Sequence, residues 1–366
     1  MSSQVPIARP ILGKEEREAV LHVLDSGHLV QGERVADFED LLAEYVGTNH
    51  AVATNSGTAA IHAALKAFGI GPGDEVILPA ITFFSCAAMV AACGATPVAV
   101  DVSVDTYTLD PDRVADALTA ETRAVMPVHL FGQPADLAPL VDLAEDHDLA
   151  VLEDACQSQG ATYQGRRVGS FGRAGCFSFY PSKLITTGEG GMVVTDGDDI
   201  ADYVRKFRSH GEASKYEHEM LGFNYRMMDL AAAMGLEQMK RIDGFIEARS
   251  RNAAYLTDTL EGVVGLETPR IAQDRTHVFY QYILRIEDAF PHTRDELIAA
   301  LRRRGIESRP SYPKPIHKQA AFESWGRAAE SPVAERVLPR MLEIPVHPSL
   351  TQADLEAIVG AFESLT

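Results

Sequence analysis

The chain has 366 residues, of which 46% are hydrophobic, and a formal net charge of -19 at pH 7. A chain of this length can bury a large core and divide into two domains. The summed negative charge disfavours nucleic acid or an anionic membrane as the main partner. No run approaches the ~20 apolar residues of a membrane span, and the N-terminus lacks the order of a secretory signal. We therefore expect a soluble, cytoplasmic protein.

Residues 51–195 alternate between short apolar runs and segments with helical spacing. Seven runs rich in valine, isoleucine or phenylalanine predict strands, at residues 51–54, 75–79, 97–100, 124–130, 149–154, 175–179 and 191–195. Helical spacing separates several of them, at residues 57–68, 84–94, 110–118 and 135–148. This alternation is typical of a mostly parallel sheet covered by helices on both faces. It predicts an α/β core.

After residue 195 the pattern changes to longer helical segments, at residues 199–210, 228–242 and 245–260. The C-terminal part reads as a smaller α+β unit, with a strand at 278–286 and helices at 294–305 and 350–362. We expect an N-terminal arm (1–30), a large domain (31–245) and a small C-terminal domain (246–366).

The four cysteines are Cys86, Cys93, Cys156 and Cys176. They form no CxxC pair, and no histidine lies at zinc-finger spacing from them. The pattern favours buried free thiols over a metal site.

A small-residue loop, Asn55 to Thr58, joins the first strand to a helical segment. Such a helix N-terminus leaves backbone N–H groups free and binds phosphate. Gly57 would let an anion approach closely, and Ser56 or Thr58 would add a hydroxyl donor. The same stretch also fits an ordinary capped helix without a ligand.

Two carboxylates, Glu153 and Asp154, end the strand 149–154. In open α/β sheets the carboxyl edge of the strands is where ligands bind, so a carboxylate there can face a cofactor. Asp154 and Gln157 together offer an anion and an amide to one ring. Alternatively, Asp154 caps the following turn.

Lys183 follows the strand 175–179 and precedes the glycine-rich run TTGEGG. A lysine at a strand end within the active edge of a sheet loses its charge readily and attacks carbonyl carbon. A lysine whose ammonium reaches solvent fits the position equally well.

The three features together match the contacts that pyridoxal phosphate needs. Lys183 would form the imine, Asp154 would keep the pyridine nitrogen protonated, and the helix N-terminus at Gly57 would hold the phosphate. The sequence therefore predicts a cofactor-dependent enzyme and no metal site.

The chain resembles the DegT/DnrJ/EryC1/StrS family of sugar aminotransferases over nearly its whole length. The matching stretches are residues 26–65, 71–85, 94–102, 127–137, 153–161, 177–195 and 222–239. The resemblance implies the fold of type I pyridoxal phosphate enzymes and a homodimer whose active sites lie at the subunit interface. It implies transfer of an amino group from L-glutamate to a nucleotide-linked keto sugar, for polysaccharide, glycan or secondary-metabolite biosynthesis, or to a keto inositol in one branch.

The resemblance also implies roles for individual residues. Lys183 corresponds to the Schiff-base lysine that moves the proton. The cofactor-binding positions are Asp154 on the pyridine nitrogen, Gln157 on the ring hydroxyl, Phe83 stacked on the ring with Phe84 as the alternative, Gly57, Thr58 and Ser178 on the phosphate, and Asn224 reaching the phosphate from the other subunit. Gln157, where other members carry histidine or glutamate, favours amination at C3 or the inositol branch over amination at C4.

The sequence also allows other functions, and it does not identify the residues that contact the substrate. A regulator that only binds the cofactor is the non-enzymatic alternative, whereas Lys183 speaks against the dehydratase branch, which has histidine at that position. The run TTGEGG lacks the GxxxxGK[ST] loop of nucleotide-hydrolysing enzymes. Candidates for substrate contacts are Arg226, Lys215, Arg309, Lys314, Tyr312, His317 and His28.

Overall fold

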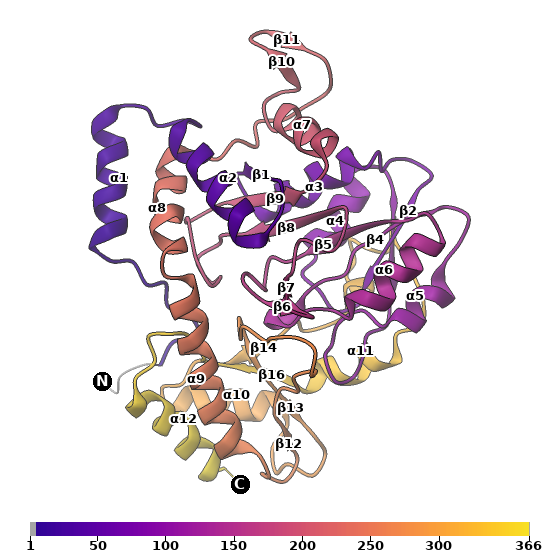
Figure 1. Ribbon diagram of the computed structural model, residues 1–366. Coiled ribbons are helices and arrows are strands. Elements are labelled where there is room, and N and C mark those ends of the chain that lie inside the picture. The colour runs from indigo at the N-terminus through magenta and orange to yellow at the C-terminus, as the bar shows by residue number, and fades with distance from the viewer. Residues whose placement is uncertain (1–4, 366) are drawn as a thin grey trace.

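The computed structural model describes residues 5–365, and an eight-stranded sheet forms its centre (Figure 1). The strand order is β1-β9-β8-β5-β4-β2-β3-β15. Neighbours from β8 to β15 pair in parallel, whereas β9 runs antiparallel to both β1 and β8. The strands are β1 His50–Thr54, β2 Glu75–Pro79, β3 Thr96–Val100, β4 Thr122–Val125, β5 Ala150–Asp154, β8 Ala174–Ser178, β9 Gly191–Thr195 and β15 Arg327–Ala328.

The predicted α/β class with a mostly parallel sheet is confirmed, but the sheet has eight strands where we expected seven. The additional strand, β15, pairs in parallel with β3 and comes from the part of the chain assigned to the small domain. It is two residues long and has no apolar run that could predict a strand. An ion pair secures it instead, because Arg327 donates from Nε and Nη2 to the carboxylate of Glu75 at 2.8 and 2.7 Å.

Helices cover both faces of this sheet, as side-chain alternation along the strands requires. One apolar core packs α3, α4 and α7 on one face, and two others pack α2, α8, α5 and α6 on the opposite face. The bounds are α2 Glu33–Val46, α3 Gly57–Ala67, α4 Ser85–Ala92, α5 Pro111–Ala117, α6 Leu137–Asp146, α7 Asp198–Phe207 and α8 Asp229–Met239.

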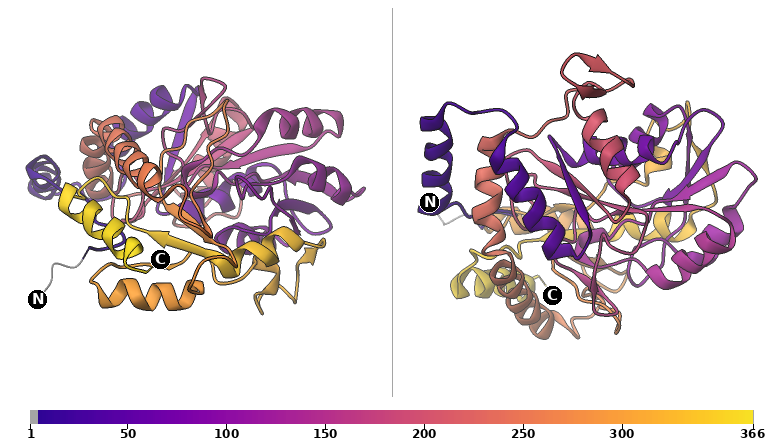
Figure 2. Two further views of the ribbon diagram at one scale, coloured as in Figure 1. Left: turned by 90° about the horizontal axis from the view of Figure 1, so that it is seen from below. Right: turned by 45° about the horizontal axis from the view of Figure 1, so that its top comes forward.

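A second sheet, antiparallel throughout and in the order β12-β13-β16-β14, has its own apolar core. It comprises β12 Leu266–Glu267, β13 Tyr282–Ile286, β16 Met341–Ile344 and β14 Arg309–Pro310, with α9 Ile242–Leu260, α10 Arg294–Arg303 and α12 Gln352–Glu363. These C-terminal elements, orange to yellow, gather at one end of the molecule (Figures 1 and 2). The expected boundary at residue 245 falls inside α9 and stays a prediction.

The remaining α-helices and strands lie outside these two sheets. They are α1 Lys14–Ser26, the two-residue hairpin strands β6 Thr162–Tyr163 and β7 Arg166–Arg167, the projecting hairpin β10 Glu212–Ser214 with β11 Glu217–His218, and α11 Pro332–Val337 (Figure 1). Helix α1 packs on α8, where Arg241 forms an ion pair with Glu16. Between residues 5 and 365, no helix is both long and apolar enough to cross a membrane.

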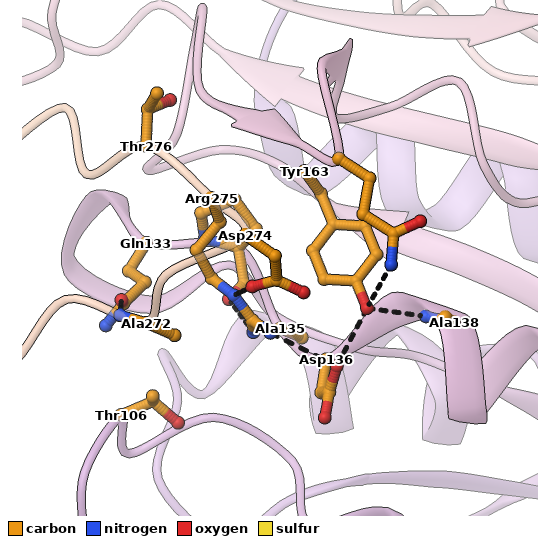
Figure 3. A network of polar contacts seen from close by, with 12 residues as sticks. Thr106, Gln133, Ala135, Asp136, Ala138, Tyr163, Ala272, Asp274, Arg275 and Thr276 are labelled. Carbon is orange, nitrogen blue, oxygen red and sulfur yellow. Dashed lines mark hydrogen bonds and ion pairs between the residues drawn. The ribbon is translucent and has the colours of Figure 1, made fainter.

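A polar network fastens the segment that leads into the second sheet onto the large sheet (Figure 3). Arg275 donates from Nη2 to Asp136 at 3.1 Å and from Nε to Asp274 at 2.7 Å. Its guanidinium lies over the ring of Tyr163, 4.8 Å from the centroid. The Tyr163 hydroxyl donates to the same Asp136 at 2.8 Å. This network fixes the second sheet relative to the carboxyl edge of the first.

Candidate active site

A cavity of about 600 Å³ lies between the carboxyl edge of the large sheet and the second sheet. Turns of the large sheet supply Ser56, Gly57, Thr58, Phe83, Asp154, Gln157, Ser178 and Lys183, among others, and the second sheet and its loops supply Tyr280, Gln281, Arg309, Tyr312 and Glu343. Seven of the eight site residues predicted from the sequence therefore line one cavity. The exception is Asn224.

The cavity meets the first turn of α3. Ser56 caps this helix, and its hydroxyl accepts a hydrogen bond from the Ala59 N–H at 3.1 Å. The N–H groups of Gly57 and Thr58 begin the helix, where the backbone dipoles favour an anion. A Cβ at Gly57 would lie 2.7 Å from the Ser178 Cβ and 3.0 Å from the Cys156 Sγ. Glycine therefore lets this helix start lie directly against β8.

The two carboxylates at the end of β5 point to opposite sides of the sheet, as neighbouring strand residues must. Asp154 lines the cavity. Glu153 is buried on the other side, where it accepts backbone N–H groups of Gly169, Phe171 and Gly172 at 2.7 to 2.8 Å. Its Oε2 also contacts the His129 imidazole at 3.0 Å. Glu153 therefore holds a turn together and does not reach the cavity.

Asp154 is a buried carboxylate whose protein partners are both neutral. It is 5% exposed; its Oδ1 accepts the Cys156 N–H and its Oδ2 accepts the Cys86 thiol, each at 3.0 Å. Among residues 5–365 no lysine, arginine or histidine forms an ion pair with it. A buried anion without a counter-charge is costly, so this site suits a cationic ring nitrogen. The residues present fit pyridoxal phosphate.

Lys183 lies in the turn that follows β8 and is half-buried at the edge of the cavity. Its Nζ lies 4.2 Å from the centroid of the Tyr280 ring. The Tyr280 hydroxyl in turn lies 2.9 Å from the Ser182 Oγ. The aromatic face stabilises a nearby ammonium, so a residue preceding β13 of the second sheet helps to direct the lysine.

Gln157 is held in one orientation by two hydrogen bonds. Its Oε1 accepts the Phe131 N–H at 2.8 Å, and its Nε2 donates to the Tyr312 hydroxyl at 2.9 Å. Burial raises the pKa of Tyr312 well above its ordinary value, so its hydroxyl keeps its proton. The second Nε2–H of Gln157 remains for a ligand in the cavity.

The two neighbouring phenylalanines occupy different surroundings. Phe83 lines the cavity and is 60% exposed, whereas Phe84 packs toward Trp325 with ring centroids 6.3 Å apart. Ser178 also lines the cavity, on the opposite side of β8 from the fully buried Phe177 and Phe179. Successive residues of this strand therefore alternate between the buried core and the cavity.

Asn224 lies outside the lining of this cavity. Its backbone carbonyl accepts a hydrogen bond from the Asn55 side chain at 3.3 Å, and its backbone pairs with Ser209. It therefore follows the projecting β10–β11 hairpin and lies next to the loop that leads into α3.

The second sheet contributes a charged cluster of which the sequence singled out only Arg309. Glu343 of β16 is buried, and it accepts hydrogen bonds from Arg309 Nε and from Gln281 Nε2, each at 2.6 Å. Burial raises the pKa of Glu343 above its ordinary value. No local motif joins these positions, because three separate segments meet only in the folded sheet. Of the seven candidate substrate contacts, only Arg309 and Tyr312 line the cavity.

Comparisons with known proteins identify the family of the chain. The model of the DegT/DnrJ/EryC1/StrS aminotransferase family matches residues 10–363. The chain is 39% identical to the GDP-perosamine synthase of Caulobacter vibrioides, over 99% of this chain and 98% of the relative. It is 40% identical to the dTDP-3-amino-3,4,6-trideoxy-alpha-D-glucose transaminase of Streptomyces venezuelae, over 96% of this chain and 92% of the relative.

A solved structure has the same architecture. The crystal structure of S. venezuelae DesV in complex with a ketimine intermediate superposes with a TM-score of 0.93 at 38% identity. The match covers 99% of this chain and 98% of that chain.

Proposed function

The chain belongs to the DegT/DnrJ/EryC1/StrS aminotransferase family, and we propose that it transfers an amino group from L-glutamate to a nucleotide-linked keto sugar using pyridoxal 5'-phosphate. One observation carries the proposal. A lysine and a buried carboxylate without a cationic partner among the described residues line the same cavity as a helix N-terminus. This set meets the three needs of the cofactor, an amine, an anion and a phosphate site.

The proposal assigns each cavity residue a task. Gly57 and Thr58, with Ser178, hold the phosphate; Phe83 covers one face of the ring; Gln157 donates to the ring hydroxyl. Asp154 keeps the ring nitrogen protonated through its charge. When bound, the cofactor withdraws electrons from the substrate carbon that bears nitrogen.

Lys183 is the residue that moves protons. Its amine would take the proton from the nitrogen-bearing substrate carbon and deliver it, on the same face, to the carbon on the other side of that nitrogen, which the bound cofactor would supply. A single base could serve both positions because both proton transfers take place on one face. The Tyr280 ring, 4.2 Å from the Nζ, stabilises the ammonium while it holds the proton.

Two substrates would use this cavity in turn. The names of the relatives, a GDP-sugar synthase and a dTDP-sugar transaminase, support a nucleotide-linked keto sugar as acceptor. The second name also agrees with amination at C3. We further propose a cytoplasmic homodimer in which Asn224 of one subunit completes the phosphate site of the other.

Absorbance of the purified protein tests the proposal. The wild type should show the visible band of a lysine-bound cofactor and lose it when L-glutamate is added. Lys183→Ala should show neither the band nor its loss, and its turnover should fall by about 10²–10⁴-fold. Screening GDP-, dTDP- and UDP-linked keto sugars against keto inositols would then identify the acceptor. A cofactor band that no amino donor changes would favour the regulator instead, and a protein that binds no pyridoxal phosphate would refute both.

A further inference from the structure

Cys86 contacts the carboxylate that faces the proposed cofactor ring. It lies in the first turn of α4, is 0% exposed and is outside the cavity lining. Its Sγ lies 3.0 Å from Asp154 Oδ2. The thiol therefore reaches Asp154 from within the protein, while the carboxylate itself borders the cavity.

The direction of the hydrogen bonds follows from the donors present. The Asp154 carboxylate has no proton to give, so the thiol is the donor in this contact. Because Cys86 has only one S–H, the Thr82 hydroxyl, 3.4 Å from the sulfur, is the donor in the second contact. The result is a short chain from Thr82 through Cys86 to Asp154, with every member at most 5% exposed.

The two hydrogen-bond donors to Asp154, the Cys86 thiol and the Cys156 N–H, are neutral, so they do not cancel the charge of the carboxylate. The Cys86 S–H and the Cys156 N–H orient the two oxygens and stabilise the ionised form. An arginine or lysine in either place would have neutralised the carboxylate. With neutral donors, the full negative charge remains available for a cation in the cavity.

One short segment contacts the site in two ways, directly through Phe83 and indirectly through Cys86 and Asp154. Phe83 and Cys86 lie three residues apart where the chain passes from β2 into α4. Phe83 extends into the cavity, and Cys86 extends toward Asp154. The helix start thus couples the residue that would cover the ring face to the residue that would hold its nitrogen partner.

We propose that Cys86 is a positioning residue for Asp154, and that its thiol fixes the carboxylate, still ionised, in line with the protonated ring nitrogen of the cofactor. The proposal rests on the function proposed above. In this proposal the buried Cys86 thiol acts as a hydrogen-bond donor to Asp154, in addition to filling space in the core.

Cofactor binding to the apoenzyme tests this without measuring turnover. Two ligands are compared, pyridoxal phosphate and its analogue with carbon in place of the ring nitrogen. Cys86→Ala should bind pyridoxal phosphate about tenfold more weakly, because a hydrogen bond to a charged group is lost. It should bind the carbon analogue as tightly as the wild type does, because that analogue has no protonated ring nitrogen with which Asp154 could interact. Cys86→Ser, which keeps a donor, should restore most of the affinity.

The matched control is Cys93→Ala, which truncates another buried thiol, at the opposite end of α4, that has no contact with Asp154. It should leave both affinities unchanged. If Cys86→Ala is too unstable to measure, Cys86→Val fills the volume without a donor and replaces it in the comparison with Cys86→Ser.

Equal losses for both ligands would assign Cys86 to packing and overturn the proposal, as would an unchanged affinity for pyridoxal phosphate. A wild-type protein that binds neither ligand would instead refute the proposed function.

Discussion

Gln157 donates a hydrogen bond from Nε2 to the hydroxyl of Tyr312 across 2.9 Å, and this contact links the end of β5 to the loop after β14. The Phe131 N–H occupies the Gln157 Oε1, so the amide cannot be reversed. Tyr312 accepts in this contact, and its own O–H remains for an oxygen of a ligand. Its φ of +60° lies in the left-handed region, a strained conformation that clusters at functional sites.

Tyr312→Phe should therefore lower kcat/KM by about tenfold or more, because a buried donor is lost. The ring would still stack on Phe131, at 6.2 Å between centroids. Steady-state kinetics measures the effect. The matched control is Tyr107→Phe, another buried tyrosine with φ of +60°, whose hydroxyl accepts from Arg285 outside this cavity. An equal loss in both variants would contradict a role for Tyr312 toward the ligand.

Gly57→Ala should weaken binding of pyridoxal phosphate and destabilise the protein by about 1–3 kcal/mol, because the new Cβ would lie 2.7 Å from the Ser178 Cβ and push α3 away from β8. Calorimetric titration and denaturant unfolding measure the two effects. Gly244→Ala, in α9, meets nothing within 4 Å and should stabilise by about 0.5–1 kcal/mol without affecting the cofactor. Tight cofactor binding by Gly57→Ala would argue against a phosphate at this helix.

Mixing two inactive variants tests whether the active sites are shared. Lys183→Ala and Asn224→Ala should each be inactive or weak alone. If Asn224 serves the site of the partner, each mixed dimer regains one intact site, and a statistical mixture recovers roughly a quarter of wild-type activity. Activity after co-refolding measures this. No recovery would mean that Asn224 acts within its own subunit or not at all.

The buried His277 should lower the free energy of unfolding as the pH falls below about 6.5. Burial lowers its pKa to about 3, while in the unfolded chain it titrates near the ordinary value of 6.5. Below pH 6.5 the unfolded state binds a proton that the folded state refuses, so stability falls as pH decreases. The expected loss is about 2 kcal/mol between pH 6.5 and pH 5.

Denaturant unfolding of the wild type and His277→Asn at several pH values would measure this loss. The variant can still accept the Phe279 N–H that the imidazole accepts at 2.9 Å. Its stability should decrease less steeply below pH 6.5. Identical slopes for the two proteins would contradict the prediction.

The sequence alone determined the parallel sheet and most of the cavity. Strand periodicity and the residues at strand ends predicted that Gly57, Asp154 and Lys183 meet, because the carboxyl ends of parallel strands share one edge, and the family resemblance added Ser178. This inference is local: each residue follows its own apolar run by a few positions.

The tertiary structure decided what no local pattern encodes. Strand β15 has two residues and forms because Arg327 pairs with Glu75, some 250 positions away. Arg309, Gln281 and Glu343 join the cavity only because the second sheet folds over it. The sequence assigned Asp154 to the cavity, but only the packing of the sheet showed that Glu153 binds the backbone N–H groups of Gly169, Phe171 and Gly172. It likewise turned Cys86, read from the sequence as one more buried thiol, toward Asp154. Contacts between distant segments depend on how whole helices and strands pack, so they cannot be predicted from the periodicity along one helix or strand.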